Sequence, residues 1–427
     1  MNGTQLPFLR TKIPGPISQQ WIDRLALREC PAITARRARR AMILGAAKDD
    51  PIVWHSAVGA NVKDVDGNIF IDLTSGFGVA GVGHRAKKTV QAAQDQMDVL
   101  VHAMGDAYAD PQRILLLEKL SELTGMDRSI LGSSGSDAVE AALKTARLFS
   151  GKDKVLSFGN AYHGLSLGVL PTTDYKSKMF RGPFQNQLAT HVTHHPFGAP
   201  LPATLKEFGA IIVEPIQGRG GIQLPPANWL ASLIDLARKD GAVVIFDEIY
   251  TGFGRTGTMF GFQDPSLNGR IPDLLCLGKG MAGGFPISAC IGRAEVMDAW
   301  GASKGEAIHT QTFLGNPVGC SMSLATISQI ERQLPEIISK GKYLRKKLQQ
   351  AGFSVRGKGM MIGVEMDNTL AASRYLLQNG FIVLPAGTNA EVLALTPPFV
   401  ISAEQMDLFV AVLKKFEQSK KAAKEDL

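Results

Sequence analysis

The middle of the chain alternates between short, uniformly apolar runs and longer amphipathic stretches. Three of the apolar runs are 154–158, 210–214 and 242–246, and each is bounded by Gly, Pro or charged residues. Such runs are typical of parallel strands that helices cover on both faces. The stretches with helical spacing are 87–101, 111–123, 138–149 and 229–239. The pattern therefore predicts a doubly wound α/β domain, which binds its ligand at the carboxyl ends of the strands.

The two ends of the chain have a different pattern. Residues 1–20 are punctuated by Pro and Gly and predict an arm that lies over another surface. Residues 51–54 and 60–72 resemble short strands, with a hairpin turn at Asp66-Gly67-Asn68. After about residue 325 the predicted elements are helices at 321–334, 337–351 and 371–379, strands at 360–366 and 381–384, and two further helical stretches at the end.

These patterns divide the chain into three parts. We expect an N-terminal arm and strands in residues 1–65, which join the smaller domain. A large cofactor-binding domain with a mostly parallel sheet would occupy residues 66–325. A smaller α+β domain would occupy residues 326–427.

Composition narrows the class of protein. The 427 residues are 45% hydrophobic, which is enough for a large core, and the formal net charge of +7 is modest. No stretch reaches a membrane-spanning length, and the N-terminus has no apolar signal region. The four cysteines, Cys30, Cys276, Cys290 and Cys320, fit neither a zinc site nor a disulfide framework. We therefore expect a soluble cytoplasmic protein with no metal site and no membrane partner.

Basic residues concentrate in one run, from Thr34 to Arg40. Such a run could contact nucleic-acid phosphates. No nucleic-acid-binding motif accompanies it, so we interpret it as a helix surface that faces solvent or another subunit. We expect no nucleic-acid partner.

Two charged residues at predicted strand ends suggest the chemistry. Asp247 follows the apolar run 242–246, and Lys279 follows a second apolar run in the bend Gly278-Lys279-Gly280. Either residue alone could be an ordinary strand-end acid or a solvated lysine. Together they suit pyridoxal 5′-phosphate (PLP), because a buried carboxylate needs a cationic partner such as a pyridinium N–H, and a lysine can hold an aldehyde as a Schiff base.

Three further segments could contribute to this site. Residues 133–137 (SSGSD) precede an amphipathic helix, where exposed N–H groups suit a phosphate but small residues also serve as ordinary helix caps. Tyr162 and His163 follow the run 154–158, where an aromatic ring could stack on a flat cofactor or simply pack. The glycine-rich residues 75–84 could form a pocket wall.

One family has this combination of motifs. The sequence DEIYTGFGRTG at residues 247–257, followed by DLLCLGKG at 273–280, resembles the class III PLP-dependent aminotransferases of fold type I. The resemblance extends from about residue 50 to about residue 415. It implies that Lys279 carries the cofactor as a Schiff base and moves protons, and that Asp247 pairs with the pyridine nitrogen.

The resemblance also implies roles for the surrounding residues. Tyr162 would stack on the cofactor ring, and Gly135 and Ser136 would hold its phosphate through backbone N–H groups. Thr312 resembles the family threonine that reaches the phosphate from the partner subunit, which implies a homodimer. The residues that would lie beside the substrate are Glu214, Phe77 and Val79.

Three positions depart from the family pattern. Tyr250 stands where many members have Gln near the 3-hydroxyl of the cofactor, to which a phenol could still hydrogen-bond. Leu165 and Ala394 stand where members that use 4-aminobutyrate or 2-oxoglutarate often have arginine. An arginine fork is the usual partner of a carboxylate. Arg219 could replace the missing arginines, or the site could be more apolar.

The combined prediction is a ping-pong aminotransferase (transaminase). It would move an amino group from an ω-amino acid or primary amine to a keto acid, either pyruvate or 2-oxoglutarate. Pyruvate is favoured because it carries a single carboxylate. The alternative is an amino-acid racemase or epimerase of the same family, which would use nearly the same residues. A protein that only binds PLP or regulates is a third interpretation, which the intact Lys279 and Asp247 disfavour.

Overall fold

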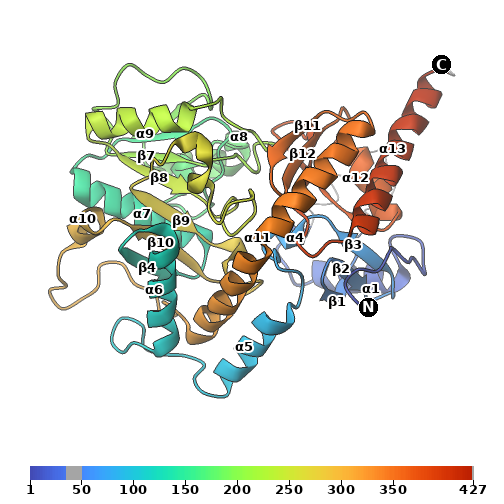
Figure 1. The fold of residues 1–427 in the computed structure, drawn as a ribbon, viewed down its shortest axis with the longest axis horizontal. Coiled ribbons are helices and arrows are strands. Elements are labelled where there is room, and N and C mark those ends of the chain that lie inside the picture. Colours follow the sequence, from blue (N-terminus) through green and yellow to red (C-terminus); the bar gives the residue numbers. More distant parts are fainter. Residues whose placement is uncertain (35–50, 426–427) are drawn as a thin grey trace.

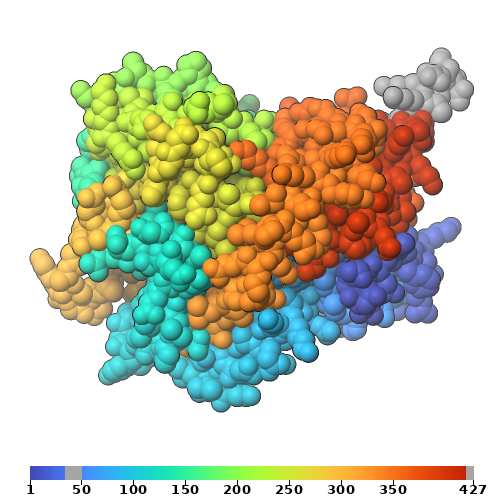
Figure 2. Space-filling view, in the orientation of Figure 1, coloured from blue at the N-terminus to red at the C-terminus, as the bar shows by residue number. Residues whose placement is uncertain are grey.

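The structure is a computed structural model that describes residues 1–34 and 51–425. It has two lobes, which lie side by side in Figure 1. The space-filling view in Figure 2 shows that the smaller lobe combines the blue N-terminal segment with the orange and red C-terminal segment. The basic residues at 36–40 lie outside the described residues. Within the described part of the chain, no helix is long and apolar enough to cross a membrane.

A seven-stranded sheet forms the centre of the larger lobe, in the order β4-β10-β9-β8-β7-β5-β6. Its strands are β4 (Arg128–Gly132), β5 (Val155–Phe158), β6 (Val192–His195), β7 (Ala210–Val213), β8 (Val243–Asp247), β9 (Leu274–Leu277) and β10 (Ser288–Gly292). The strands from β9 to β6 are parallel, whereas β10 is antiparallel to both β4 and β9. The mostly parallel sheet predicted from the sequence is therefore confirmed.

Helices bury both faces of this sheet. The helices of the larger lobe are α5 (Lys87–Met97), α6 (Pro111–Thr124), α7 (Gly135–Ser150), α8 (Ser177–Phe180), α9 (Trp229–Asp240) and α10 (Ala294–Met297). Along β8, Val243 and Ile245 pack in one core cluster with α7, while Val244 and Phe246 pack in another with α9. Successive residues of a strand point to opposite faces, so burial of both faces requires an unbroken apolar run.

The smaller lobe contains two four-stranded sheets. The first has the order β1-β2-β3-β13 and the second β11-β12-β15-β14. Their strands are β1 (Trp54–Val58), β2 (Asn61–Asp64), β3 (Ile69–Asp72), β11 (Val355–Lys358), β12 (Met361–Glu365), β13 (Phe381–Ile382), β14 (Leu384–Ala386) and β15 (Val392–Leu395). The parallel pairing of β13 with β3 attaches the N-terminal strands to the C-terminal part of the chain.

The helices of the smaller lobe differ from the prediction. They are α1 (Pro16–Ala26), α2 (Pro31–Thr34), α4 (Ser75–Gly78), α12 (Thr369–Gln378) and α13 (Ala403–Glu425), and α11 (Pro317–Gln350) extends into this lobe from the larger one. The predicted break between residues 334 and 337 is wrong, because α11 continues through Pro335. Proline usually interrupts a helix, but buried Ile330 and Ile337 on either side of it anchor this one. The sequence likewise predicts two helices at the C-terminal end, where the structure has the single helix α13.

The predicted domain boundaries fall inside structural units. The boundary after residue 65 lies in the turn between β2 and β3, which pair with each other. The boundary after residue 325 lies within α11, which packs on α5 and α6 in the larger lobe and on α13 in the smaller one. The division into three parts stays a prediction.

Candidate active site

Four of the predicted site residues meet at one edge of the central sheet. Glu214 directly follows β7, Asp247 is the last residue of β8, and Lys279 lies two positions after β9. Tyr162 comes from the segment after β5. Because these strands are parallel, their carboxyl ends meet at the same edge. The order of the strands in the sheet reverses here, since β6 lies on one side of β5 and β7, the next strand in the sequence, lies on the other.

Asp247 is buried and held by a histidine. Its Oδ2 lies 2.7 Å from Nδ1 of His163, and its Oδ1 accepts a hydrogen bond from the N–H of Ile249 at 3.1 Å. The side chain of His163 is fully buried and that of Asp247 is 4% exposed. Since the carboxylate is an acceptor, Nδ1 of His163 carries the hydrogen. The pair keeps a negative charge fixed at the tip of β8.

Lys279 begins a single helical turn and has a φ of +36°. This conformation is rarely adopted by a residue with a side chain, so the surrounding structure must hold it there. Burial lowers the pKa of Lys279, which Asp247 and Glu214 oppose and Arg219 reinforces. A lowered pKa increases the fraction of neutral amine, which is the form that attacks an aldehyde and accepts a proton.

Tyr250 lies beneath the amine of Lys279. Its ring centroid is 4.6 Å from Nζ, and its hydroxyl oxygen is 3.3 Å from Oγ1 of Thr396 on the other lobe. The ring occupies a slot between two glycines. A Cβ atom would come within 2.4 Å of the ring at Gly78 and within 2.2 Å at Gly218. Both glycines are therefore needed for Tyr250 to occupy this position.

Glu214 connects two segments of the site. Its Oε1 accepts a hydrogen bond from the N–H of Tyr162, and its Oε2 accepts one from the N–H of Gly218, both at 3.0 Å. Burial raises the pKa of Glu214 to about 7; nearby His163 lowers it and Asp247 raises it further. Glu214 therefore fixes the backbone at both Tyr162 and the turn that carries Arg219.

Arg219 is a cation that has no acidic partner in the part of the chain that the structure describes. Its guanidinium carbon lies 4.5 Å from the ring centroid of Tyr162 and 5.8 Å from that of Tyr175. Among the residues that the structure describes, no carboxylate forms an ion pair with it. A guanidinium that stacks on aromatic rings keeps its N–H donors free for a ligand carboxylate or phosphate.

The start of α7 offers hydrogen-bond donors to an anion. Oδ2 of Asp137 accepts bonds from the N–H groups of Ser133 and Ser134, which closes a capping box. Burial tends to raise the pKa of Asp137, but bonds with Gln311 and with Ser134 lower it overall. The first N–H groups of a helix, here at Gly135 and Ser136, have no partner within the helix. Together with the helix dipole they suit a phosphate.

The remaining predicted residues surround this centre less closely. Phe77 lies in the turn α4 with a φ of +68° and a side chain that is 49% exposed, and Val79 is half-buried beside it. Leu165 is exposed. Ala394 packs with Tyr250 in a small apolar cluster. Thr312 is exposed next to Gln311.

Sequence reasoning missed Arg255 and Thr396. Arg255 is buried, and its Nη1 donates to the carbonyl oxygens of Met360 at 3.2 Å and Pro397 at 2.7 Å. Burial lowers its pKa to about 10. Arg255 therefore ties the loop after β8 to the smaller lobe. It lies within the family motif, which could have signalled it, whereas nothing in the sequence marks Thr396.

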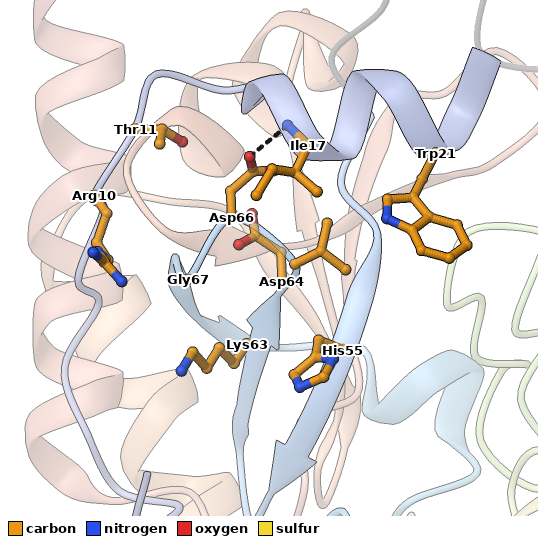
Figure 3. Close-up of a pocket in the computed structure, with 10 residues that line it drawn as sticks. Arg10, Thr11, Ile17, Trp21, His55, Lys63, Asp64, Asp66 and Gly67 are labelled. Carbon is orange, nitrogen blue, oxygen red and sulfur yellow. Dashed lines mark hydrogen bonds between the residues drawn. The ribbon is translucent and has the colours of Figure 1, made fainter. Parts of the chain in front are cut away.

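A surface hollow lies away from this centre. It has a volume of about 610 Å³ and is lined by residues of the N-terminal arm and of β1 and β2, including Arg10, Trp21, His55 and Lys63 (Figure 3). In the same place Asp66 accepts hydrogen bonds from the first N–H groups of α1. None of the predicted site residues lines this hollow.

The residues at the sheet edge fit PLP. A lysine whose pKa is lowered by burial suits the aldehyde, and a buried carboxylate fixed by histidine suits a pyridinium. The free helix start suits the phosphate. These three groups come from β8, β9 and α7, which share one edge of the sheet.

Comparison with known proteins gives a consistent result. Residues 44–416 match the family described as Aminotransferase class-III. The chain is 35% identical over 384 residues to an acetylornithine aminotransferase of Methanothermobacter thermautotrophicus, covering 88% of this chain and 96% of the relative. It is 34% identical over 458 residues to a 4-aminobutyrate aminotransferase of Mycobacterium tuberculosis, covering 95% and 97%. The solved ornithine aminotransferase of Toxoplasma gondii superimposes with a TM-score of 0.79 at 26% identity, covering 95% and 98%.

Proposed function

The chain belongs to the class III aminotransferases, which are PLP-dependent enzymes of fold type I, and we propose how its own residues divide the work of amino transfer. The reaction moves an amino group from an amine to a keto acid. When bound, PLP supplies an aldehyde that exchanges amino groups and a ring that accepts electrons from the substrate carbon. The residues of the protein bind the cofactor and the substrate, orient them and move the proton.

Lys279 and Asp247 carry the chemistry. Lys279 would hold the cofactor through its aldehyde, and when its amine is free it would carry the proton from the donor carbon. The lowered pKa that burial gives Lys279 supports this role, because only the neutral amine accepts a proton. Asp247, fixed by His163, keeps the ring nitrogen protonated. Trapping with borohydride tests the assignment: the reduced cofactor should be found on the Lys279 peptide by mass spectrometry.

The other residues orient the cofactor. Tyr162 stacks on its ring, supported by the bond that fixes the Tyr162 backbone to Glu214. Gly135 and Ser136 hold its phosphate through N–H groups at the start of α7. Tyr250 lies beside it, next to Lys279.

The substrate binds on the side of Arg219, Phe77, Val79 and Glu214. The observation that carries this proposal is the unpaired guanidinium of Arg219 beside Lys279, which would bind the carboxylate of an amino or keto acid. An ω-amino acid or a primary amine is the donor. The relatives named for acetylornithine and 4-aminobutyrate are consistent with an amino group at the far end of the substrate.

Pyruvate is the preferred acceptor. Ala394 lies in an apolar cluster with Met361 and Ile216, so this position offers a second carboxylate no cationic side chain of its own. Donor amines assayed with pyruvate and with 2-oxoglutarate test this proposal. We expect a higher kcat/KM with pyruvate, and an Arg219→Met variant should raise KM for it. A strong preference for 2-oxoglutarate would refute the proposal.

Amino transfer is favoured over racemisation because the relatives reported above are aminotransferases. Incubating the enzyme with one enantiomer of an amino donor and no keto acid separates the two reactions. Amino transfer would consume at most one equivalent of donor per active site, because no keto acid is present to complete the cycle. Racemisation without that consumption would favour the alternative.

The active unit is a homodimer in which Thr312 of each protomer reaches the cofactor phosphate of its partner. Support comes from an apolar surface formed by residues 97–115 and 308–313, where Val99, Tyr108 and Ile308 are each at least 70% exposed. Exposed apolar surface of this kind marks protein–protein contacts. Light scattering should give a dimer, and Tyr108→Asp should yield monomers that lose PLP. A monomeric, fully active wild type would refute this.

The enzyme works in the cytoplasm. The support is its cysteines, which are free, with Cys276, Cys290 and Cys320 buried in the core. Fractionation of cells that express the tagged chain tests this, because the activity should stay in the cytosolic fraction.

A further inference from the structure

We propose that Tyr250 is a positioning residue that holds the Lys279 amine against its ring whenever this amine is not bonded to the cofactor. The proposal rests on the assignment of Lys279 given above. Nζ lies 4.6 Å from the ring centroid, which is within the range of a cation–π contact. The ring therefore stabilises the ammonium form that Lys279 takes each time it accepts a proton.

The slot around Tyr250 is built to keep the ring in place. The φ of Gly218 is not positive, so its backbone conformation would accept a side chain. A Cβ atom there would, however, collide with the ring of Tyr250 and lie close to the methyl group of Met361. At the opposite edge of the ring, Gly78 leaves the same space. The hydroxyl is linked to Thr396, whose own hydroxyl donates to the carbonyl oxygen of Thr74 at 3.1 Å. Three separate segments thus fix the ring.

The charged groups near Lys279 do not hold its amine in place. Asp247 and Glu214 face the amine and favour its ammonium form, while Arg219 disfavours it. Neither carboxylate forms an ion pair with Lys279 in the described residues. Asp247 is engaged by His163, and Glu214 by two backbone N–H groups. The aromatic face is the group that the structure places directly against the amine.

The hydroxyl of Tyr250 does not act as an acid or base in this scheme. Burial raises the pKa of Tyr250, although Thr396 and the neighbouring arginines oppose this, so the phenol stays neutral. Its hydroxyl is used by Thr396. The ring face and the hydroxyl can therefore be separated by mutation.

The decisive comparison is between Tyr250→Phe and Tyr250→Leu. Phenylalanine keeps the ring face and loses the hydroxyl, whereas leucine loses both. The full-length holoenzyme is first converted to the amine form of the cofactor, which frees Lys279. A small acetylating reagent, which reacts with neutral amines, is then applied across a pH series, and labelling of Lys279 is quantified by mass spectrometry against surface lysines.

In Tyr250→Leu we expect the labelling midpoint to fall by about one pH unit, since a desolvated cation–π contact changes an ionisation constant by about tenfold. In Tyr250→Phe and in the control Thr396→Val the midpoint should stay within about 0.3 unit of wild type. The leucine variant should also lose kcat with KM unchanged. Should Tyr250→Leu fail to fold, Tyr250→Met removes the ring with a flexible side chain of similar length.

Two results would overturn the proposal. An unchanged midpoint in the folded leucine or methionine variant would show that the ring does not act on the amine. An equal shift in Tyr250→Phe would assign the effect to the hydroxyl. Borohydride trapping on wild-type Lys279 separates this outcome from failure of the proposed function: no trapping refutes the lysine assignment, whereas trapping with an unchanged midpoint refutes only the role of Tyr250.

Discussion

Replacing Glu248 by Gln should remove part of the pH dependence of stability. Glu248 is fully buried directly after Asp247, and it accepts hydrogen bonds from the N–H groups of Gly261 and Phe262 and from the hydroxyl of Thr251. Burial raises its pKa from 4.5 to about 7, although these bonds oppose the shift. The folded protein therefore keeps a proton that the unfolded chain releases between about pH 4.5 and about pH 7.

The size of the effect follows from the shift. A difference of about 2.5 units, at 1.36 kcal/mol per unit, corresponds to about 3 kcal/mol. The pKa of Glu248 is higher in the folded protein than in the unfolded chain. Glu248 therefore contributes fully to the stability of the folded protein below about pH 4.5, and this contribution is lost as the pH rises to about 7. Gln stays neutral throughout. The variant should therefore gain stability relative to wild type as the pH rises.

Thermal unfolding of the holoenzyme from pH 5 to pH 8 measures this contribution. The quantity of interest is the Tm of Glu248→Gln minus that of wild type, because other titrating groups cancel in this difference. It should increase by a few degrees across the series. Glu122→Gln, at an exposed site, serves as the control and should give a flat difference. A flat difference for Glu248→Gln as well would refute the reasoning.

Three further outcomes are expected. Asp247→Asn should lower the single-turnover rate about 100-fold or more, because it removes the charge that we propose to keep the ring nitrogen protonated; near wild-type turnover would contradict this role. Arg255→Met should destabilise the protein by about 2 kcal/mol or more, since two buried carbonyl oxygens of the smaller lobe lose their donor; thermal unfolding measures this, and an unchanged Tm would contradict it. Asp66→Ala should cost about 1 kcal/mol at the start of α1, where its carboxylate caps two N–H groups; limited proteolysis should then cleave the N-terminal arm faster than in wild type.

Some elements could not be predicted because their signal is not local. Strands β4 and β10 carry no long apolar run, and they are strands because of antiparallel pairing, β4 with β10 and β10 with both β4 and β9. Pro335 predicted the end of a helix, yet buried residues on both sides of it keep α11 continuous across the two lobes. Strand β13 lies within the strand predicted at 381–384, but its pairing with β3, far away in the sequence, has no local signal.

In the candidate site, too, some features follow from the local sequence and others arise only from the fold. Asp247 and Lys279 could be found from the sequence because each follows an apolar run at a strand end, and parallel strands bring such ends together. The acid–histidine bond, the stacking of Arg219 on Tyr162 and the contact of Tyr250 with Lys279 join residues from different strands. Their side-chain directions are fixed by packing.

The sequence by itself determined the parallel sheet and the cofactor, and it predicted the residues that we propose to act on that cofactor. These depend on local patterns: apolar runs that bury both faces of a strand, and charged or glycine residues where each strand ends. The tertiary structure decided which neighbouring groups hold those residues in position. Thr396 reaches Tyr250 across the two lobes, and Glu214 binds two separate backbone segments. Such contacts arise only when distant segments pack together, because burial and hydrogen bonding then select one arrangement of their side chains.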